Sequence, residues 1–455
     1  MPSFNPPFDP AYPPAWPRTA PDQLDVAILG AGQTGVALWH GLRRAGIDNI
    51  ALFDAAAPGA EGVWRTTARM RVLRTDKDIT GPELGEDALS FRRWLTERSG
   101  ADAFDALDRI PRLLWQDYLD WFRAAVGARP VWHHRLVAVA PAAAGLTLTF
   151  ASPEGRRTVT ARHLLVATGM DGFGAPWIPD TLRRMVPAAR LSHTADAIPF
   201  ADLAGARVLV VGAAAGAFDA AATALEHGAA EVIQISRQPD LLPDLPRGAL
   251  RHLVTERRFF HRLSDATRWA TILHARRRGV PPEAARARLA GLAGHQLHFG
   301  HGIDTVEATG DGIAVRINGT LRPVDHVIAG TGYRQGARLR PEFAPLAPLI
   351  RTWGGRGLPT PAGAEHWGDL PYLGAGFELL PAAEADAWVS RIHILTFAAI
   401  LSHGVHVGDI ASARLAVPRL VDHVAGRLFE TARATHEAEA RAKIGPAPAR
   451  QEQAA

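Results

Sequence analysis

The chain has 455 residues, of which 47% are hydrophobic and 21% charged, the balance of a soluble globular protein with two or three domains. The formal net charge is only +4 and no dense basic block accompanies the pI of about 9.9, so nucleic-acid binding is not expected. The chain contains no cysteine, which excludes disulfides, cysteine-ligated metal sites and thiol nucleophiles.

Residues 1–22 are rich in proline and are expected to form an extended arm. They lack the basic and apolar regions of a signal peptide, and no later stretch has the pattern of a membrane span. A cytoplasmic protein without membrane attachment is therefore expected. At the other end, residues 431–455 are rich in Ala, Glu and Arg and are expected to form a flexible tail.

Between these ends, one strand–turn–helix–strand pattern occurs twice, about 180 residues apart. The first copy has strands at 26–29 and 50–53, and the second has strands at 208–211 and 231–235. Further elements are expected as strands at 136–139, 146–150, 164–167, 306–318 and 325–329, and as helical segments within 64–122, 248–293 and 414–429.

This order predicts an α/β fold with two Rossmann-like dinucleotide-binding domains. The first, an FAD-binding domain, is expected to be discontinuous, over residues 23–203 and 331–430. The second, an NAD(P)H-binding domain, is expected at 204–330, inserted into the first.

The first turn is a full G-x-G-x-x-G, carried by Gly30, Gly32 and Gly35. The first glycine allows the tight turn, the second lets a pyrophosphate approach the backbone, and the third lets the helix pack on the strand. Asp54 ends the next strand, where an acid accepts from a ribose hydroxyl. The pattern predicts a dinucleotide site, with a glycine-rich turn of an unrelated α/β fold as the alternative.

The second turn, carried by Gly212 and Gly216, is weaker because Ala214 replaces the middle glycine. The strand that follows ends at Ser236 and Arg237 rather than at an acid. A hydroxyl beside a guanidinium suits a 2′-phosphate, so we expect NADPH here. A surface role for Arg237 is the alternative.

Two later strands each end in a Thr-Gly pair, at Thr168-Gly169 and Thr331-Gly332. We expect both pairs to be crossings between the domains, close to the bound dinucleotides. Together the two turns predict FAD and NADPH in one chain, with a hydride passing from nicotinamide to flavin.

With these turns, the sequence resembles the FAD- and NADPH-dependent flavoprotein monooxygenases with two dinucleotide-binding domains. This family includes the flavin-containing monooxygenases, the Baeyer–Villiger enzymes and the microbial N-hydroxylating monooxygenases. The segment ending at Trp64, Glu-Gly-Val-Trp, is similar to the family's G-G-x-W. The stretches around His403 and Asp409 resemble its C-terminal flavin-binding segment. The resemblance implies cofactor contacts from these three residues, with a structural or hydrogen-bonding role as the alternative for His403.

The stretch from Leu73 to Lys77 resembles a family segment near the flavin, with Asp76 where the flavin-containing monooxygenases have Asn. Lys77-Asp78-Ile79 is similar to a Lys-Asp-Leu of the N-hydroxylating enzymes, in which the lysine lies near the substrate carboxylate. The resemblance therefore implies Lys77 as a substrate contact, Arg74 as a partner of an anionic peroxide or substrate acid, and Asp76 as a partner of an amine. Surface ion pairing is the alternative for all three.

The resemblance implies that reduced flavin and O2 form a C4a-hydroperoxide, which transfers one oxygen atom to a small-molecule substrate. Only His193 remains of the linker motif F-x-G-x-x-x-H, with Pro187 and Ala189 at the other marked positions. N- or S-oxygenation is therefore favoured over Baeyer–Villiger oxygenation.

Two other functions stay open: an NAD(P)H-dependent reductase that passes electrons to another acceptor, and a flavin-binding protein without turnover. A disulfide reductase is excluded, because it needs a cysteine pair. No metal is expected from the histidine spacing. A homo-oligomer is compatible with the sequence.

Overall fold

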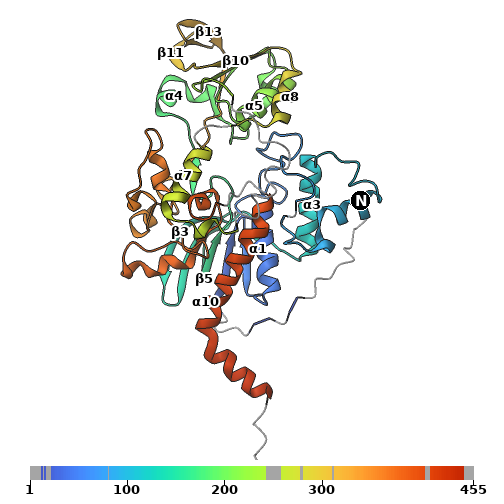
Figure 1. Ribbon diagram of the computed structural model, residues 1–455, viewed down its shortest axis with the longest axis vertical. Coiled ribbons are helices and arrows are strands. Elements are labelled where there is room, and N and C mark those ends of the chain that lie inside the picture. The colour runs from blue at the N-terminus through green and yellow to red at the C-terminus, as the bar shows by residue number, and fades with distance from the viewer. Residues whose placement is uncertain are drawn as a thin grey trace, which may run out of the picture.

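The computed structural model describes residues 12–13, 15–16, 22–79, 81–241, 258–276, 280–309, 312–404 and 410–444. It has two lobes, each built on its own sheet (Figure 1). The lower lobe in that view carries α1, α3, α10, β3 and β5, and the upper lobe carries α4, α5, α8 and β10. None of the helices in the described ranges is both long and apolar enough to cross a bilayer.

The first lobe contains a six-stranded sheet in the order β2-β1-β5-β4-β3, with β16 also paired to β5. Pairing is parallel between β1 and β2, β1 and β5, and β5 and β16, and antiparallel along β3-β4-β5. The strands are β1 Leu24–Leu29, β2 Ile50–Phe53, β3 Arg135–Ala142, β4 Gly145–Ser152, β5 Gly155–Val166 and β16 Ile392–Ile394.

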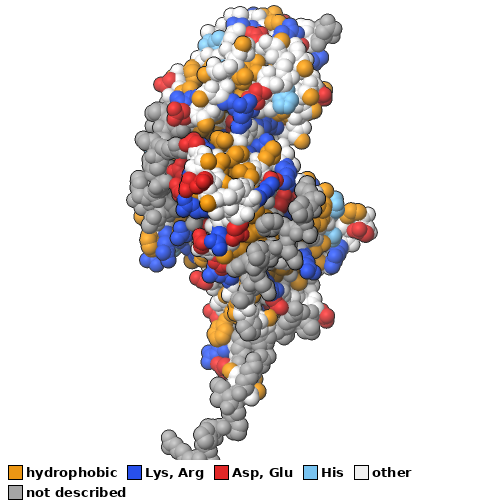
Figure 2. Space-filling view, turned by 90° about the vertical axis from the view of Figure 1, so that its right-hand side faces the viewer, with side chains coloured by type: hydrophobic (Ala, Val, Ile, Leu, Met, Phe, Trp, Pro, Cys, Tyr) orange, Lys and Arg blue, Asp and Glu red, His pale blue; other side chains and the backbone are white. Residues whose placement is uncertain are grey.

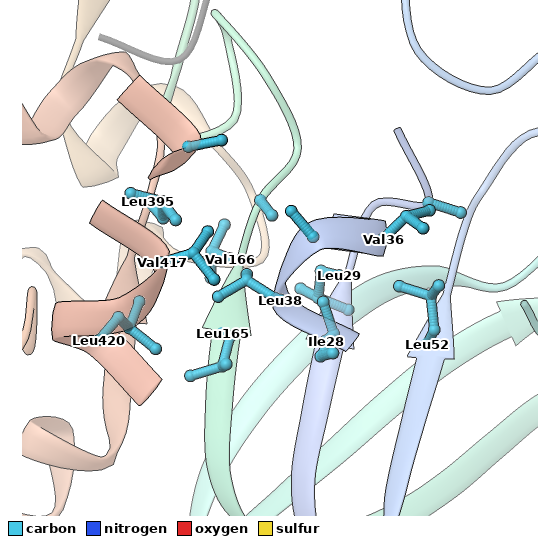
Figure 3. Packing of buried hydrophobic residues seen from close by; sticks show 14 of the residues in the cluster. Ile28, Leu29, Val36, Leu38, Leu52, Leu165, Val166, Leu395, Val417 and Leu420 are labelled. Carbon is cyan, nitrogen blue, oxygen red and sulfur yellow. The ribbon is translucent and has the colours of Figure 1, made fainter. Parts of the chain in front are cut away.

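The core of this lobe lies between the sheet and two helices, α1 (Gln33–Arg44) and α10 (Ile410–Ile444) (Figure 3). Leu38 of α1 lies between Leu165 of β5 and Val417 of α10. Apolar residues recur at helical spacing along α1, so one face of it is buried against strands that are themselves almost wholly apolar. This packing holds the first glycine turn in place at the carboxyl end of β1.

The remaining helices of the first lobe are α2 (Phe91–Ser99), α3 (Arg112–Ala125) and the short α9 (Ile400–His403). At the N-terminus, the Tyr12 hydroxyl lies 2.9 Å from His40 Nδ1 of α1, and Trp16 N donates to Gly46 O. The described part of the predicted N-terminal arm therefore packs on this lobe. Helix α10 continues to Ile444, through a stretch whose composition suggested a flexible tail, and its end projects from the body (Figure 1).

The second lobe has a wholly parallel sheet in the order β10-β9-β8-β14-β7, a second doubly wound unit. Its strands are β7 Leu191–His193, β8 Arg207–Val211, β9 Glu231–Ser236, β10 His295–Phe299 and β14 His326–Ala329. Its helices are α4 Asp180–Met185, α5 Ala215–Glu226 and α8 Glu283–Ala290, and a small antiparallel sheet adds β11 Ile303–Ala308, β12 Ile313–Ile317 and β13 Thr320–Val324. Strand β7 precedes residue 204, the expected start of this domain.

Helix α7 (Asp265–Arg276) lies within the range expected for the second domain but packs on the first lobe. Trp269 and Ile272 form its buried face, and Trp269 stacks on Trp353 with ring centroids 6.0 Å apart. Phe397 and Leu401 complete this cluster. The chain therefore returns to the first lobe between β9 and β10 because the apolar face of α7 finds its partners there.

Candidate functional site

A cavity of about 2850 Å³ lies between the lobes and is lined by both glycine turns. Single-ligand pockets occupy roughly 300–1,000 Å³, so this cavity has room for more than one large ligand. Its wall includes most of the cofactor residues expected from the sequence, namely Gly30, Gly32, Asp54, Trp64, Thr168, Gly169, Gly212, Gly216, Ser236, Arg237, Thr331 and Gly332.

The first turn leaves an open cradle at the N-terminus of α1. Gly30 has φ +94°, and a Cβ there would lie 2.6 Å from Ala167 O, so only glycine fits. At Gly32 an added Cβ would meet only Gly62, at 3.6 Å. Helix α1 has no side-chain cap and no acid in its first turn. Its free N–H groups therefore suit a pyrophosphate.

Gly35 and Asp54 contribute to this site in different ways. A Cβ on Gly35 would overlap the carbonyl oxygen of Gly30, so this glycine allows the close packing of helix on strand and does not line the cavity. The Asp54 carboxylate accepts from Ala31 N at 2.6 Å and from Ala56 N at 2.8 Å. These bonds hold the carboxylate at the end of β2, where it could also accept from a ribose hydroxyl.

The strand order sets the direction in which FAD would lie. A pyrophosphate on α1 would sit beyond the end of β1, with β2 on one side and β5 on the other. Asp54 follows β2, and Thr168 and Gly169 follow β5. The adenosine half would therefore extend over β2 and the flavin half over Thr168 and Gly169.

The second turn repeats this geometry. A Cβ on Gly212 would overlap Gly330 O, and α5 also lacks a side-chain cap and an acid in its first turn. Beyond Gly216 the nearest side chain, Thr194, would be 3.6 Å from an added Cβ. In the order β9-β8-β14, Ser236 ends β9 and Arg237 follows it, whereas Thr331 and Gly332 follow β14. The adenosine half of a nicotinamide dinucleotide would extend toward the first pair and the nicotinamide toward the second.

The reactive halves of both dinucleotides would meet, because the two Thr-Gly segments lie side by side. Strand β6 (Gly174–Pro176) pairs antiparallel with β15 (Tyr333–Gln335). Trp177 N donates to Gly332 O at 2.9 Å, and Gln335 Nε2 donates to Met170 O at 2.8 Å. These bonds join the crossings just beyond the places where flavin and nicotinamide would lie.

The three expected catalytic residues have different surroundings. Asp76 lies in the cavity wall. Arg74 also lines the cavity, and its guanidinium is paired with Asp219 of α5 at 2.6 Å. Lys77 is not among the described lining residues, since its Nζ donates to the carbonyls of Phe104 and Leu107 at 2.8 and 2.6 Å. The structure thus gives Lys77 a role in holding a loop, which differs from the expected substrate contact.

His403 also differs from the expectation. It is only 1% exposed and lies in the packing of α9, with its ring 3.8 Å from that of Phe377 and its Nε2 3.0 Å from Gly374 O. Burial lowers its pKa well below the ordinary value. The second residue expected from the same segment, Asp409, lies outside the described residues.

Sequence reasoning missed the residues that join the lobes. Arg69 donates to Thr194 O and to Asp196 O, and Arg288 of α8 donates to Arg69 O at 2.7 Å. Arg69 and Thr194 are 125 residues apart in the chain. No local motif marks such pairs.

Comparisons with known proteins agree with this geometry. Residues 27–171 match a family model described as FAD-NAD(P)-binding. The chain is 36% identical over 417 residues to the FAD-dependent urate hydroxylase of Xanthomonas campestris pv. campestris, covering 89% of this chain and 86% of that protein.

Solved structures share the fold at lower identity. The ornithine hydroxylase of Pseudomonas aeruginosa has a TM-score of 0.67 at 17% identity, covering 89% of this chain and 99% of that one. The L-lysine 6-monooxygenase of Pseudomonas syringae has a TM-score of 0.67 at 20% identity, covering 88% and 99%. The chain belongs to the FAD-dependent flavoprotein monooxygenases, enzymes that bind FAD and NAD(P)H.

Proposed function

We propose that this enzyme uses NADPH to reduce FAD and then transfers one oxygen atom from O2 to a small planar molecule. The observation that carries the proposal is the pairing of β6 with β15, which joins the two crossings beside one cavity. Bound FAD supplies the activation of O2, and NADPH supplies the electrons. The protein binds both and shields the point where they meet.

The preference for NADPH over NADH rests on the end of β9. Arg237 is exposed and lines the cavity, and no carboxylate in the described residues forms an ion pair with it. The Ser236 hydroxyl accepts from Gln238 N at 3.1 Å, which keeps it beside the same strand end. A guanidinium next to a hydroxyl suits a 2′-phosphate.

A third part of the cavity wall lies outside both glycine turns and suits the substrate. This part is largely aromatic, with Trp269 and Leu273 from α7, Trp367 and Phe397. The Arg276 guanidinium lies 5.4 Å from the Phe397 ring centroid and adds positive charge. Flat rings and a cation favour a planar, anionic substrate.

Urate, the substrate named for the X. campestris relative, is such a molecule and is the first candidate. N- or S-oxygenation of an amine or thioether is the second. It is favoured over Baeyer–Villiger oxygenation because the expected linker histidine, His193, is only 1% exposed, with its ring packed edge-on against Tyr333. The position of Lys77 removes one argument for an amino-acid substrate, so urate should be tested first.

The test is a reaction of the FAD-loaded enzyme with NADPH and urate under ¹⁸O2. One ¹⁸O atom in the product, with about one NADPH oxidised per product, supports urate hydroxylation. Label found only in products from a panel of amines and thioethers supports the second candidate. NADPH oxidation that releases only hydrogen peroxide would contradict oxygen transfer and support a reductase or oxidase, whereas unreduced flavin would support a protein without turnover.

A further inference from the structure

The loop that follows Trp64 crosses from the flavin side of the cavity to the second lobe. It contributes Arg74, which pairs with Asp219 of α5 at 2.6 Å, and Arg71, which pairs with Glu226 of α5 at 2.7 Å. Both arginines also line the cavity. One loop therefore touches both the space for the flavin and the helix whose N-terminus would hold the NADPH pyrophosphate.

Arg288 of α8 completes these contacts. Its guanidinium lies 2.6 Å from Glu226 and 3.5 Å from Asp219, and it donates to the carbonyl of Arg69 at 2.7 Å. We call Arg71, Arg74, Asp219, Glu226 and Arg288 the interlobe cluster. Figure 2 shows basic and acidic side chains interspersed over the middle of the molecule, between the lobes.

Asp219 is the centre of the interlobe cluster. Its side chain is only 6% exposed, whereas that of Arg74 is 40% exposed and that of Arg71 is 68% exposed. It lies one helical turn after Ala215, the first residue of α5. A buried carboxylate shared by a cation of the loop and a cation of α8 fixes three segments in one arrangement.

We propose that Asp219, together with Arg74 and Arg288, is a positioning residue that sets the nicotinamide against the flavin for hydride transfer. The inference rests on the proposed function, in which NADPH reduces the flavin. Hydride transfer needs the reacting atoms in near-contact geometry, and a displacement of about 1 Å can cost on the order of 100-fold in rate. A cluster that holds the lobes in register would act on that geometry without touching either ring.

The first experiment measures anaerobic flavin reduction by NADPH in the FAD-loaded enzyme. Asp219→Asn should lower the limiting reduction rate at least tenfold, with FAD content unchanged and the dissociation constant for NADPH changed less than threefold. Asp325→Asn is the matched control, because it removes another arginine-paired carboxylate of the same lobe (Arg207, 2.7 Å) away from the loop. An unchanged limiting rate in Asp219→Asn, or a change in NADPH affinity alone, would overturn the proposal.

Should Asp219→Asn fail to fold, Arg74→Gln tests the same contact from its exposed end. Where both single variants fold, the two rate losses should not add in the double variant, since both changes break the Arg74–Asp219 contact. Additive losses would mean that the two residues act independently and would contradict the interlobe cluster as a unit.

The second experiment does not depend on turnover. The chain has no cysteine, so Glu154→Cys in the first lobe and Thr320→Cys in the second can be spin-labelled without competing sites. Pulsed electron paramagnetic resonance measures the distance between the two spin labels. The distance distribution should be narrow in the labelled protein without further substitution and in its Asp325→Asn variant, and broad or shifted in its Asp219→Asn variant. Unchanged distances in Asp219→Asn would overturn the proposal, whether or not NADPH reduces the wild-type enzyme. Failure of NADPH to reduce the wild-type enzyme would by itself contradict only the proposed function.

Discussion

At the residue scale, the two glycine turns differ in their middle position but not in their backbone. Gly32 (φ −71°, ψ −174°) and Ala214 (φ −92°, ψ 176°) are both extended, a conformation that any residue adopts. The middle glycine of the first turn is therefore needed for space beside a phosphate and not for its dihedral angles. The first residues, Gly30 and Gly212, do require positive φ, and both are glycine.

Gly32→Val should give folded protein without FAD, because the side chain would fill the gap between Gly32 and Gly62 that a pyrophosphate would use. The measurement is the flavin absorbance relative to protein absorbance after purification. Gly426→Val, at an exposed helical glycine with no atom near its added Cβ, is the control and should retain flavin. Normal FAD content in Gly32→Val would refute the assignment of this turn.

Arg237→Ala should raise the Michaelis constant for NADPH by about 10-fold or more and leave that for NADH nearly unchanged. The reason is the loss of a charge-assisted contact, worth about 1.5–3 kcal/mol, that only the 2′-phosphate makes. Steady-state kinetics with both nucleotides provide the comparison. An equal effect on both would show that Arg237 does not read the phosphate.

At the element scale, the strand–turn–helix units could be predicted because their signals are local: a buried strand, glycines at fixed spacing and an apolar helix face. The return of α7 to the first lobe could not be predicted, because Trp269 of α7 stacks on Trp353, more than 80 residues away in the sequence. The same limit applies to His403 and Lys77, for which the motifs indicated contact with a ligand. In the structure His403 contacts Gly374 and Lys77 contacts Phe104, residues far from them in the sequence, and these contacts give both side chains structural roles.

Strands β5 and β16 bury a histidine pair that makes stability depend on pH. Burial keeps both rings neutral. His393 Nδ1 lies 2.8 Å from Gly376 O, which can only accept, so Nδ1 donates there and the neutral ring's Nε2 accepts from His163 Nδ1 at 3.1 Å. Burial lowers the pKa of His393 to about 3 and that of His163 well below the ordinary value of 6.5.

Below pH 6.5 the unfolded chain takes up protons at these histidines and the folded chain does not, so the free energy of unfolding should fall as pH falls from 6.5 toward 4. Each histidine contributes at most about 1.4 kcal/mol per pH unit. Urea unfolding at several pH values should therefore show a smaller slope for His393→Gln than for the parent. The exposed His227→Gln is the control, and an unchanged slope in His393→Gln would refute this origin of the acid sensitivity.

At the scale of the whole molecule, the sequence indicated two nucleotide sites but not how they face each other. That arrangement depends on the β6–β15 pairing and on contacts such as Arg74 with Asp219, 145 residues apart. The strand order explains the result: in each sheet the reactive half of the dinucleotide would extend toward the crossing segment, and the crossings are joined. How the two lobes face each other is therefore set by contacts between residues far apart in the sequence, which local motifs do not reveal.

FAD would contact segments from distant parts of the first lobe, including the turn at Gly30, the loop at Trp64 and the crossing at Thr168. A ligand that binds only the folded state at 100 times its dissociation constant stabilises it by about 2.7 kcal/mol. Removing FAD should therefore lower Tm by roughly 3 °C or more.

Scanning calorimetry of the holoenzyme, the apoenzyme and the apoenzyme with FAD restored measures this effect. NADP⁺ added to the apoenzyme should raise Tm less than FAD does, because it would bind the second lobe and not the segments of the first. The Gly32→Val variant serves as an internal check, since its Tm should not respond to added FAD. Equal Tm values for the holoenzyme and apoenzyme would mean that the cofactor does not bridge these segments, and the placement of FAD across β2, β1 and β5 would have to be abandoned.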